Sequence, residues 1–460
     1  MEDQNRGLSG DGRGKKEGVE VMTQEVREKT SSRKSTESAG KIRAIVKRMY
    51  QEAQQAKEEK RKVAYCMVMC NYEEILAAMD IVQVYTENYA GLCAVKRQAE
   101  PYMEKARAEG YSDLLCGYTQ VGIGFDALRR ELGGVPPDAP DGGMPEPDML
   151  LGCSMGCDPR WKWYQALGRY KDTPIYNMDV LMPPSDANMD AIEEHSVRYM
   201  AEELRGLIAF LEEQTGKKMD YDRLMAIVRQ VEETRWWWRE AYELRKAIPC
   251  PMSTQDHFVL FVPHHMLLTD PMTLDFYKGL YQELKERVDN KIGAIGEEKY
   301  RLLWGVGLPP WHSMYILDYF LDYGAVFAAE TAYMVPEPFE IPPDVSDPVE
   351  VIALRAFERN TSLQRQGQEA GGIPPLAQAH LERIRDYSID GVVMHITRSC
   401  RASTMGQILV RNVIRDHYPG LPVMFMESDI IDLQTYSEAE TKNRIDAFME
   451  MVDANKRSAA

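Results

Sequence analysis

The chain has 460 residues, with 72 acidic against 55 basic side chains and a formal net charge of −17. This acidic balance argues against nucleic acid and anionic membrane surfaces as partners, and no run of about 18 apolar residues is present to form a transmembrane helix. The first residues are polar and lack the apolar core of a secretory signal. Eight cysteines scattered through so long a chain favour a reducing compartment and metal or redox chemistry over structural disulfides. We therefore expect a soluble cytoplasmic protein.

The first half of the chain alternates between helical and strand patterns. Residues 1–40 are rich in Gly, Ser, Lys and Glu, which predicts a disordered leader. An N-terminal α/β domain is expected over residues 41–250, and its first helix begins near Lys41. Buried apolar runs predict strands at 63–69, 148–151 and 174–180. The Pro- and Gly-rich segment 133–147 predicts a loop, and Asp158-Pro159 opens a helix because proline fits a first helical turn.

The second half, residues 251–460, repeats this alternation and is expected to form a C-terminal α/β domain. Apolar runs predict strands at 300–306, 325–329, 391–396 and 422–426. The last two enclose a helical stretch and so predict a β-α-β unit. With a long helical segment at 188–246, the pattern predicts two open, mostly parallel sheets plus helical segments. The topology is Rossmann-like but carries no dinucleotide motif.

Several common cofactor motifs are missing from the sequence. No G-x-x-x-x-G-K-[ST] stretch is present, so a phosphate loop for ATP is not indicated. No G-x-G-x-x-G links a strand to a helix, and no C-x-x-C pairs with a second one as in zinc ribbons or ferredoxin-type runs. His264 and His265 are adjacent in sequence, and such neighbours cannot easily bind one metal together.

Single cysteines follow the predicted strands or occupy turns. Cys400 comes after the strand at 391–396, Cys157 follows the strand at 148–151, and Cys116 lies in the turn-like segment GYSDLLCGY. Open parallel sheets bind ligands at the carboxyl ends of their strands, and thiolates are the usual ligands of iron–sulfur clusters. Three such thiolates can hold one [4Fe–4S] cluster and leave its fourth iron open. The alternative is that these are unrelated core thiols.

Five segments give the sequence a family resemblance. They are Cys116 in SDLLCGY, MPEPDMLLGCSMGCDPRWKWY, EEKYRLLWGVGLPPW, DGVVMHITRSCRASTMGQ and ESDIIDLQTYSEAETKNRIDAFMEMV. In this combination the chain resembles the benzoyl-CoA reductase and (R)-2-hydroxyacyl-CoA dehydratase family over roughly residues 45–453. The resemblance implies that Cys116, Cys157 and Cys400 are the ligands of a [4Fe–4S] cluster, with Cys153 as the alternative to Cys157. It also implies an acyl-CoA substrate, a homologous second cluster-bearing subunit, and separate ATP-hydrolysing activator subunits.

Two reactions follow from the resemblance. EEKYRLLWGVGLPPW and KNRIDAFMEMVD look most like the larger cluster-bearing subunit of ATP-dependent benzoyl-CoA reductase, which dearomatises its thioester. MHITRSCR looks closer to the dehydratase α-type subunits, which remove water through a ketyl radical. We expect the reductase, with the dehydratase as alternative and a non-catalytic scaffold subunit as a further one.

Additional site residues are expected around Cys400. The reductase needs a proton donor, and Ser403, His395 and Tyr118 are candidates. Arg398 and Arg401 flank Cys400 and are expected to tune the cluster or to contact an anionic intermediate. The phosphates of CoA have no obvious basic patch, which leaves local side chains such as Arg160 and Lys162, or helix N-termini.

Overall fold

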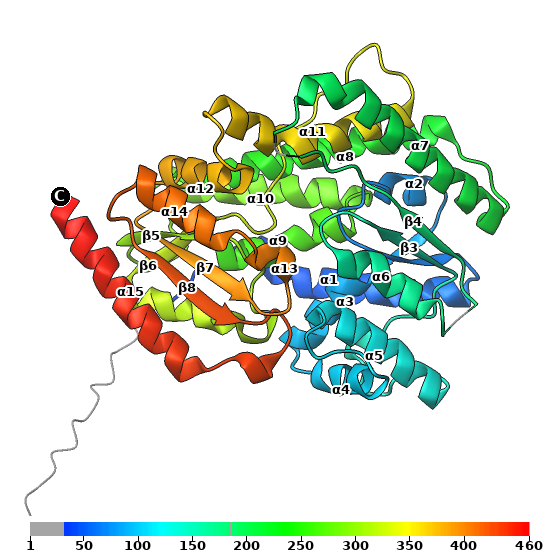
Figure 1. Ribbon diagram of the computed structural model, residues 1–460, viewed down its shortest axis with the longest axis horizontal. Helices are drawn as coiled ribbons and strands as arrows, with labels where there is room; N and C mark the ends of the chain where they lie inside the picture. The colour runs from blue at the N-terminus through cyan, green and yellow to red at the C-terminus, as the bar shows by residue number, and fades with distance from the viewer. Residues whose placement is uncertain (1–31, 171, 185, 460) are drawn as a thin grey trace, which may run out of the picture.

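The computed structural model describes residues 32–170, 172–184 and 186–459. This part of the chain forms two four-stranded sheets in which all strand pairs are parallel (Figure 1). The N-terminal sheet has the order β2-β1-β3-β4, with β1 Val63–Cys66, β2 Val82–Tyr85, β3 Met149–Cys153 and β4 Ile175–Met178. The C-terminal sheet has the order β6-β5-β7-β8, with β5 Tyr300–Trp304, β6 Ala325–Glu330, β7 Gly391–Thr397 and β8 Val423–Ser428. The prediction of two open parallel-sheet α/β domains is confirmed.

Burial explains why these strands are visible in the sequence. Strands β1, β3 and β6 are buried at every position. A parallel strand covered by helices on both faces needs apolar side chains on both sides, so it appears as an uninterrupted apolar run. Strand β8, at the edge of its sheet, instead alternates between more and less buried residues.

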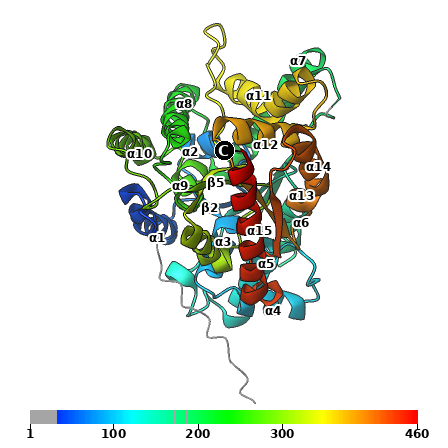
Figure 2. The same ribbon diagram turned by 90° about the vertical axis from the view of Figure 1, so that its left-hand side faces the viewer.

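Helices cover both sheets and fill the space between them. The first half contributes α1 Glu37–Glu58, α2 Glu73–Ala78, α3 Thr86–Val95, α4 Glu100–Ala108, α5 Gly117–Leu132 and α6 Asp158–Leu167. The middle of the chain forms α7 Met189–Thr215, α8 Tyr221–Glu243, α9 Thr254–Met266 and α10 Pro271–Asp289. The second half adds α11 Pro348–Glu369, α12 Pro375–Asp386, α13 Arg401–Thr404, α14 Gln407–His417 and α15 Glu438–Ala459. In Figure 2 the last helix, α15, crosses in front of the C-terminal sheet.

The first helix starts earlier than the sequence pattern indicated. Residues 1–31 of the expected leader lie outside the described residues, but residues 32–36 contact the C-terminal half. The Lys34 amide donates to the Ala294 carbonyl at 2.7 Å, and the Thr36 amide donates to Asp256 Oδ2 at 2.7 Å. Thr36 also caps α1, because its side chain accepts from the Ala39 amide. The helix therefore begins at Glu37, ahead of the expected start at Lys41.

The helices of the two halves pack on one another across the expected boundary near residue 250. Helix α1 contacts α9 and α10, and α11 contacts α7 and α8. Arg355 on α11 lies 2.7 Å from the Glu74 carboxylate on α2, and both side chains are buried. A cut at residue 250 thus separates the two sheets but not the helical layer between them (Figures 1 and 2).

Among the described residues, no helix combines the length and the apolar character that crossing a membrane requires.

Gly124 shows how closely the helices approach. It lies in α5, and a Cβ atom added there would sit 1.7 Å from the Tyr102 carbonyl oxygen on α4. We expect Gly124→Ala to lower the free energy of unfolding by about 3 kcal/mol or more, because backbone atoms must move to admit the methyl group. Gly279→Ala in α10 is the matched control, since nothing lies within 4 Å of its added Cβ. The control should be neutral or stabilising by roughly 0.5–1 kcal/mol. Equal effects of the two substitutions in urea unfolding would contradict the close α4–α5 contact.

Candidate functional site

Each of the three predicted cysteines is the N-cap residue of a helix. Cys116 precedes α5, Cys157 precedes α6 and Cys400 precedes α13, and all three are partly buried. Cys157 follows β3 and Cys400 follows β7. Each of these strands lies where the order of the strands in its sheet changes direction along the chain. In open parallel sheets, ligands bind at the carboxyl ends of the strands at this reversal point. Cys157 and Cys400 therefore lie at the expected ligand-binding edges of the two sheets, whereas Cys116 lies in the connection from α4 to α5.

The three thiols lie close enough to influence one another. Burial raises the pKa of Cys116, and the nearby Cys400 and Cys157 raise it further. Burial also raises the pKa of Cys157 to about 11, with a smaller contribution from Cys400. The fold thus brings together residues from three separate loops, 41 and 243 positions apart in sequence.

Helix N-termini partly offset the cost of burying these thiols. The backbone amides of Thr119 and Tyr118 lower the pKa of Cys116, although burial dominates and the net shift is upward. The Arg160 amide acts in the same way on the pKa of Cys157. Amides at the start of a helix favour a negative charge, so the N-cap positions of Cys116 and Cys157 assist a thiolate.

The loops of Cys116 and Cys400 contact each other directly. The Gly117 amide donates to Ser399 Oγ at 3.2 Å, and the Ser399 amide donates to Asp429 Oδ2 at 2.9 Å. The other oxygen of Asp429 accepts from the amides of Ile431 and Asp432 at 3.0 and 3.2 Å. A Cβ atom on Gly117 would lie 2.7 Å from Ile431 Cβ, so only glycine permits this approach.

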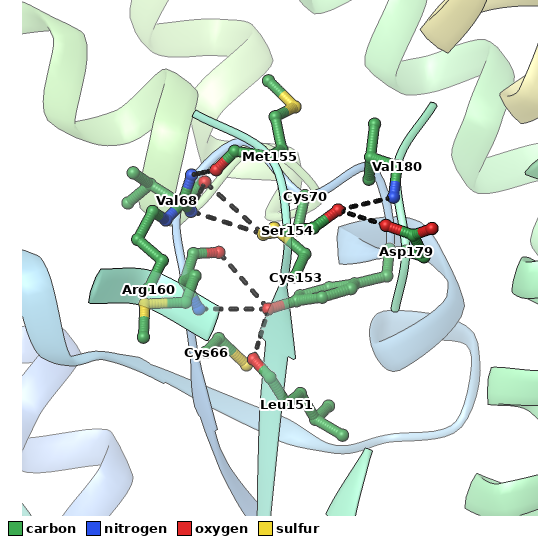
Figure 3. The surroundings of a disulfide bond; sticks show 12 residues. Cys66, Val68, Cys70, Leu151, Cys153, Ser154, Met155, Arg160, Asp179 and Val180 are labelled. Carbon is green, nitrogen blue, oxygen red and sulfur yellow. Dashed lines mark hydrogen bonds between the residues drawn. A yellow bond between two sulfur atoms is a disulfide. The ribbon is translucent and has the colours of Figure 1, made fainter. Parts of the chain in front are cut away.

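Cys153, the alternative to Cys157, is bonded elsewhere. It forms a disulfide with Cys70, which departs from the expectation of free thiols throughout (Figure 3). Strands β1 and β3 are neighbours in the sheet, with Cys66 opposite Leu151, so Cys153 at the end of β3 lies near Cys70 in the loop after β1. Cys157 has a free thiol, and the nearby Cys400 contributes to raising its pKa.

Arg160 connects the disulfide to the cysteine site. Its guanidinium donates to the Met155 carbonyl at 3.0 Å, to the Val68 carbonyl, and to Cys70 Sγ at 3.3 Å (Figure 3). Its Nε lies 3.3 Å from the Glu87 carboxylate. Since Arg160 is buried and engaged with the protein, it serves the loop geometry. Lys162 is exposed and donates to Gln165 Oε1 at 3.3 Å.

Two tyrosines meet beside the thiols. Tyr118 Oη accepts a hydrogen bond from Trp311 Nε1 and lies 3.5 Å from Tyr333 Oη. Burial is the main cause that raises the pKa of both phenols. The Tyr333 pKa is further raised by Glu87 and Cys400, which places the tyrosine near the cysteine site. Both hydroxyls therefore remain protonated at neutral pH.

The other predicted proton donors face the protein. The two ring nitrogens of His395 lie 2.5 Å from the Leu308 carbonyl and 2.7 Å from Ser428 Oγ, and the side chain is fully buried. Ser403 Oγ donates to the Cys400 carbonyl at 3.3 Å and so stabilises the turn.

The two flanking arginines point toward solvent. Arg398 pairs with Glu427 at 2.9 Å, and Arg401 pairs with Asp158 at 3.2 Å, with exposed side chains on both arginines. The second pair joins α13 to α6, which lie side by side where the two halves meet (Figures 1 and 2).

Glu87, Tyr333 and Asp429 belong to this neighbourhood, but little in the sequence pattern indicated their role. Asp429 follows an apolar run, as a residue at a strand end does. Glu87 lies in a segment whose pattern was ambiguous, and Tyr333 lies at the start of the loop after β6. The left-handed backbone of Tyr333 (φ 53°) is visible only in the structure.

The described residues contain no group of three or more His, Cys, Asp or Glu side chains that could hold a metal ion. The thiols of Cys116, Cys157 and Cys400 are partly buried and influence one another electrostatically. An iron–sulfur cluster would bind each thiolate through a different iron, so its ligands need not meet at a single ion.

His395 gives a pH-dependent prediction. Burial lowers its pKa to about 4, below the ordinary value near 6.5. Between these two values the unfolded chain therefore binds a proton at this histidine more readily than the folded chain does. The free energy of unfolding falls as the pH drops from about 6.5 to 4, by about 3 kcal/mol for this residue. We expect His395→Gln to flatten the dependence of unfolding free energy on pH in that window, as measured by urea unfolding at a series of pH values. Parallel pH profiles for wild type and His395→Gln would contradict a neutral, buried His395.

Several known proteins are similar to this chain over most of its length. The alpha subunit of lactoyl-CoA dehydratase from Anaerotignum propionicum is 27% identical over 401 residues, covering 84% of this chain and 90% of that one. The (R)-phenyllactyl-CoA dehydratase alpha subunit of Clostridium sporogenes is 27% identical over 426 residues, covering 91% and 96%. A benzoyl-CoA reductase subunit of Thauera aromatica is 27% identical over 421 residues, covering 88% and 91%.

The relatives are thus enzyme subunits, divided between dehydratases and a reductase. A family model described as 2-hydroxyglutaryl-CoA dehydratase, D-component, matches residues 68–452. Because this match spans most of the chain, the chain belongs to the 2-hydroxyglutaryl-CoA dehydratase D-component family.

Proposed function

We propose that this chain is the iron–sulfur catalytic subunit of an enzyme that transfers electrons to an acyl-CoA thioester. The observation that carries the proposal is the convergence of Cys116, Cys157 and Cys400 from three helix N-caps. A [4Fe–4S] cluster held by these three thiolates would supply one-electron transfer at low potential and one open iron.

The surrounding residues hold the thiolates in place. Helix amides stabilise negative charge on Cys116 and Cys157, and the Asp429 carboxylate fixes the turn that carries Cys400. The Gly117–Ser399 hydrogen bond keeps the first and last of these loops in contact. Partial burial limits the access of water, which would otherwise compete with the substrate.

Tyr118 and Tyr333 are the proton donors that we propose. Their hydroxyls lie together near the thiols and are protonated at neutral pH, because burial raises both pKa values. His395 does not take that role, because both of its ring nitrogens already have protein partners. Ser403 is a weaker candidate, because its hydroxyl is engaged with the Cys400 carbonyl.

The dearomatising reduction of an aromatic acyl-CoA is our first candidate reaction. It adds two electrons and two protons to the ring and leaves the thioester intact. Stacked rings beside the site support an aromatic acyl group: Phe261 lies 4.3 Å from Tyr333, and Trp311 lies 6.1 Å from Phe261, centroid to centroid. The electrons are proposed to come from separate ATP-hydrolysing activator subunits, and a homologous second cluster-bearing subunit would complete the enzyme.

Dehydration of a 2-hydroxyacyl-CoA is the second candidate. It removes water without net oxidation or reduction, so an electron would be returned after each turnover. The relatives named lactoyl-CoA and (R)-phenyllactyl-CoA dehydratase support this reaction as strongly as the reductase supports the first.

Iron content tests the cluster and separates it from a scaffold role. We expect anaerobically purified protein to contain about four iron atoms per chain, and Cys400→Ser to lose most of the iron and its visible absorption. Cys93→Ser is the control, because this buried thiol lies outside the site and should leave iron unchanged. Iron-free wild-type protein that retains full activity in its complex would refute the cluster.

Product analysis decides between the reactions. The native complex should be given ATP, a strong reductant, and benzoyl-CoA or 2-hydroxyacyl-CoA thioesters in parallel, followed by mass spectrometry. A gain of two hydrogens on benzoyl-CoA is expected for the reductase. Water loss from a hydroxyacyl thioester, with benzoyl-CoA untouched, would replace it with the dehydratase and leave the cysteine assignment standing.

A further inference from the structure

The loop after β6 carries Tyr333, a proposed proton donor, in an uncommon backbone conformation. Its backbone is left-handed, with φ at 53°. A bulky side chain rarely adopts this conformation, and a residue in it persists only where its surroundings hold it there. Residues held in this way are concentrated at active sites and ligand-binding loops. The contacts that hold Tyr333 come from α9.

The start of α9 holds the backbone of Tyr333. His257 Nε2 lies 3.0 Å from the Tyr333 carbonyl oxygen. Within the described residues, the Tyr333 backbone makes no other hydrogen bond. A carbonyl oxygen can only accept, so Nε2 carries the ring proton and is the donor, while the buried Nδ1 has no partner. Burial is the main cause that lowers the pKa of His257 to about 4, so the ring is neutral at neutral pH.

The imidazole of His257 is itself fixed by buried neighbours. Its ring stacks on Trp238, with centroids 5.4 Å apart and an interplanar angle of 8°. Its Nε2 also lies 3.5 Å from Oε1 of Glu330, the last residue of β6. Two contacts of 2.8 and 2.9 Å join the Glu330 carboxylate to Arg245, and His257, Glu330 and Arg245 are all fully buried. The ring plane of His257 and the direction of its Nε2–H bond are thus both set by the surrounding protein.

The same helix holds the ring of Tyr333. Phe261, one turn after His257, stacks on the Tyr333 ring with centroids 4.3 Å apart. The His265 ring, a further turn along, meets the Tyr333 ring edge to face at 6.0 Å. His257, Phe261 and His265 are spaced four residues apart, so they lie on one face of the helix. Helix α9 therefore contacts Tyr333 at its carbonyl and at its ring, and the Tyr333 hydroxyl lies 3.5 Å from Tyr118 Oη.

We propose that His257 is a positioning residue, which through its hydrogen bond to the Tyr333 carbonyl keeps the Tyr333 hydroxyl beside Tyr118 at the cysteine site. This role rests on the proposed function, in which Tyr333 donates a proton to the acyl group. His257 itself does not contact the substrate, because its fully buried ring is enclosed by Trp238 and Glu330. Without its bond, the loop relaxes from the left-handed conformation and the hydroxyl moves. Such a displacement slows the chemical step more than it weakens the binding of the thioester.

Crystal structures of the wild-type, His257→Phe and His257→Gln proteins test the positioning without an assay. Phenylalanine keeps a ring that can stack on Trp238 but has no donor, whereas glutamine retains an N–H donor. We expect Tyr333 to leave the left-handed region in His257→Phe, with its hydroxyl displaced from Tyr118. In His257→Gln both features should be kept. His257→Leu, which also lacks a donor, takes the place of His257→Phe if that protein does not fold.

His380→Phe is the matched control for the loss of a buried histidine. His380 is also fully buried, but its ring nitrogens contact the Thr331 hydroxyl and the Leu376 carbonyl rather than Tyr333. Tyr333 should keep its conformation in this protein. A left-handed Tyr333 with an undisplaced hydroxyl in folded His257→Phe or His257→Leu protein overturns the proposal. Equal displacement of Tyr333 in the His380→Phe control also overturns it, because the effect is then not specific to His257.

Steady-state kinetics separate positioning from a merely structural role. With the thioester that the native complex converts, His257→Phe should lower kcat at least tenfold and change KM less than twofold, and His257→Gln should recover most of kcat. Because His257 acts through Tyr333, the double variant His257→Phe, Tyr333→Phe should be no slower than Tyr333→Phe alone. Effects that multiply in the double variant overturn the proposal. An unchanged kcat in Tyr333→Phe instead refutes the proposed proton donor, and the crystal structures then decide by themselves whether His257 holds Tyr333.

Discussion

The partly buried contact among Gly117, Ser399 and Asp429 joins the two halves of the chain at the candidate site. It joins a turn of the N-terminal half to a turn of the C-terminal half through 3.2 and 2.9 Å hydrogen bonds. Because Gly117 has no side chain, α5 can start directly against Ile431. The two sheets meet with their carboxyl ends directed at one place, and Cys116 and Cys400 are brought together as neighbours of these residues.

The site combines three sources of positive potential with buried thiols. Helix amides hydrogen-bond to the thiols of Cys116 and Cys157. The Arg160 guanidinium donates to Cys70 Sγ of the disulfide. Burial nevertheless raises the pKa values of the Cys116 and Cys157 thiols. Binding of a metal cluster would reverse this, since coordination favours the thiolate far more than a helix N-terminus does.

A disulfide also lies beside the site. It joins Cys153 at the end of β3 to Cys70 in the loop after the neighbouring strand β1. Arg160 donates to Cys70 Sγ and lies on α6, the helix that Cys157 caps. The disulfide and the candidate site are therefore linked through one helix.

The sequence by itself determined the class of fold and the strands other than β2 (Val82–Tyr85), and it singled out three cysteines as candidates. Parallel strands buried on both faces must be apolar throughout, so a local run of apolar residues is enough to predict them. Cys157 and Cys400 could be singled out because each follows such a run. It could not determine that Cys153 pairs with Cys70, that both nitrogens of His395 are occupied, or that Tyr333 and Glu87 lie beside the thiols. It also placed the first helix too late, because Thr36 is fixed by Asp256, 220 residues away. These features depend on which distant segments meet, and only tertiary packing decides that.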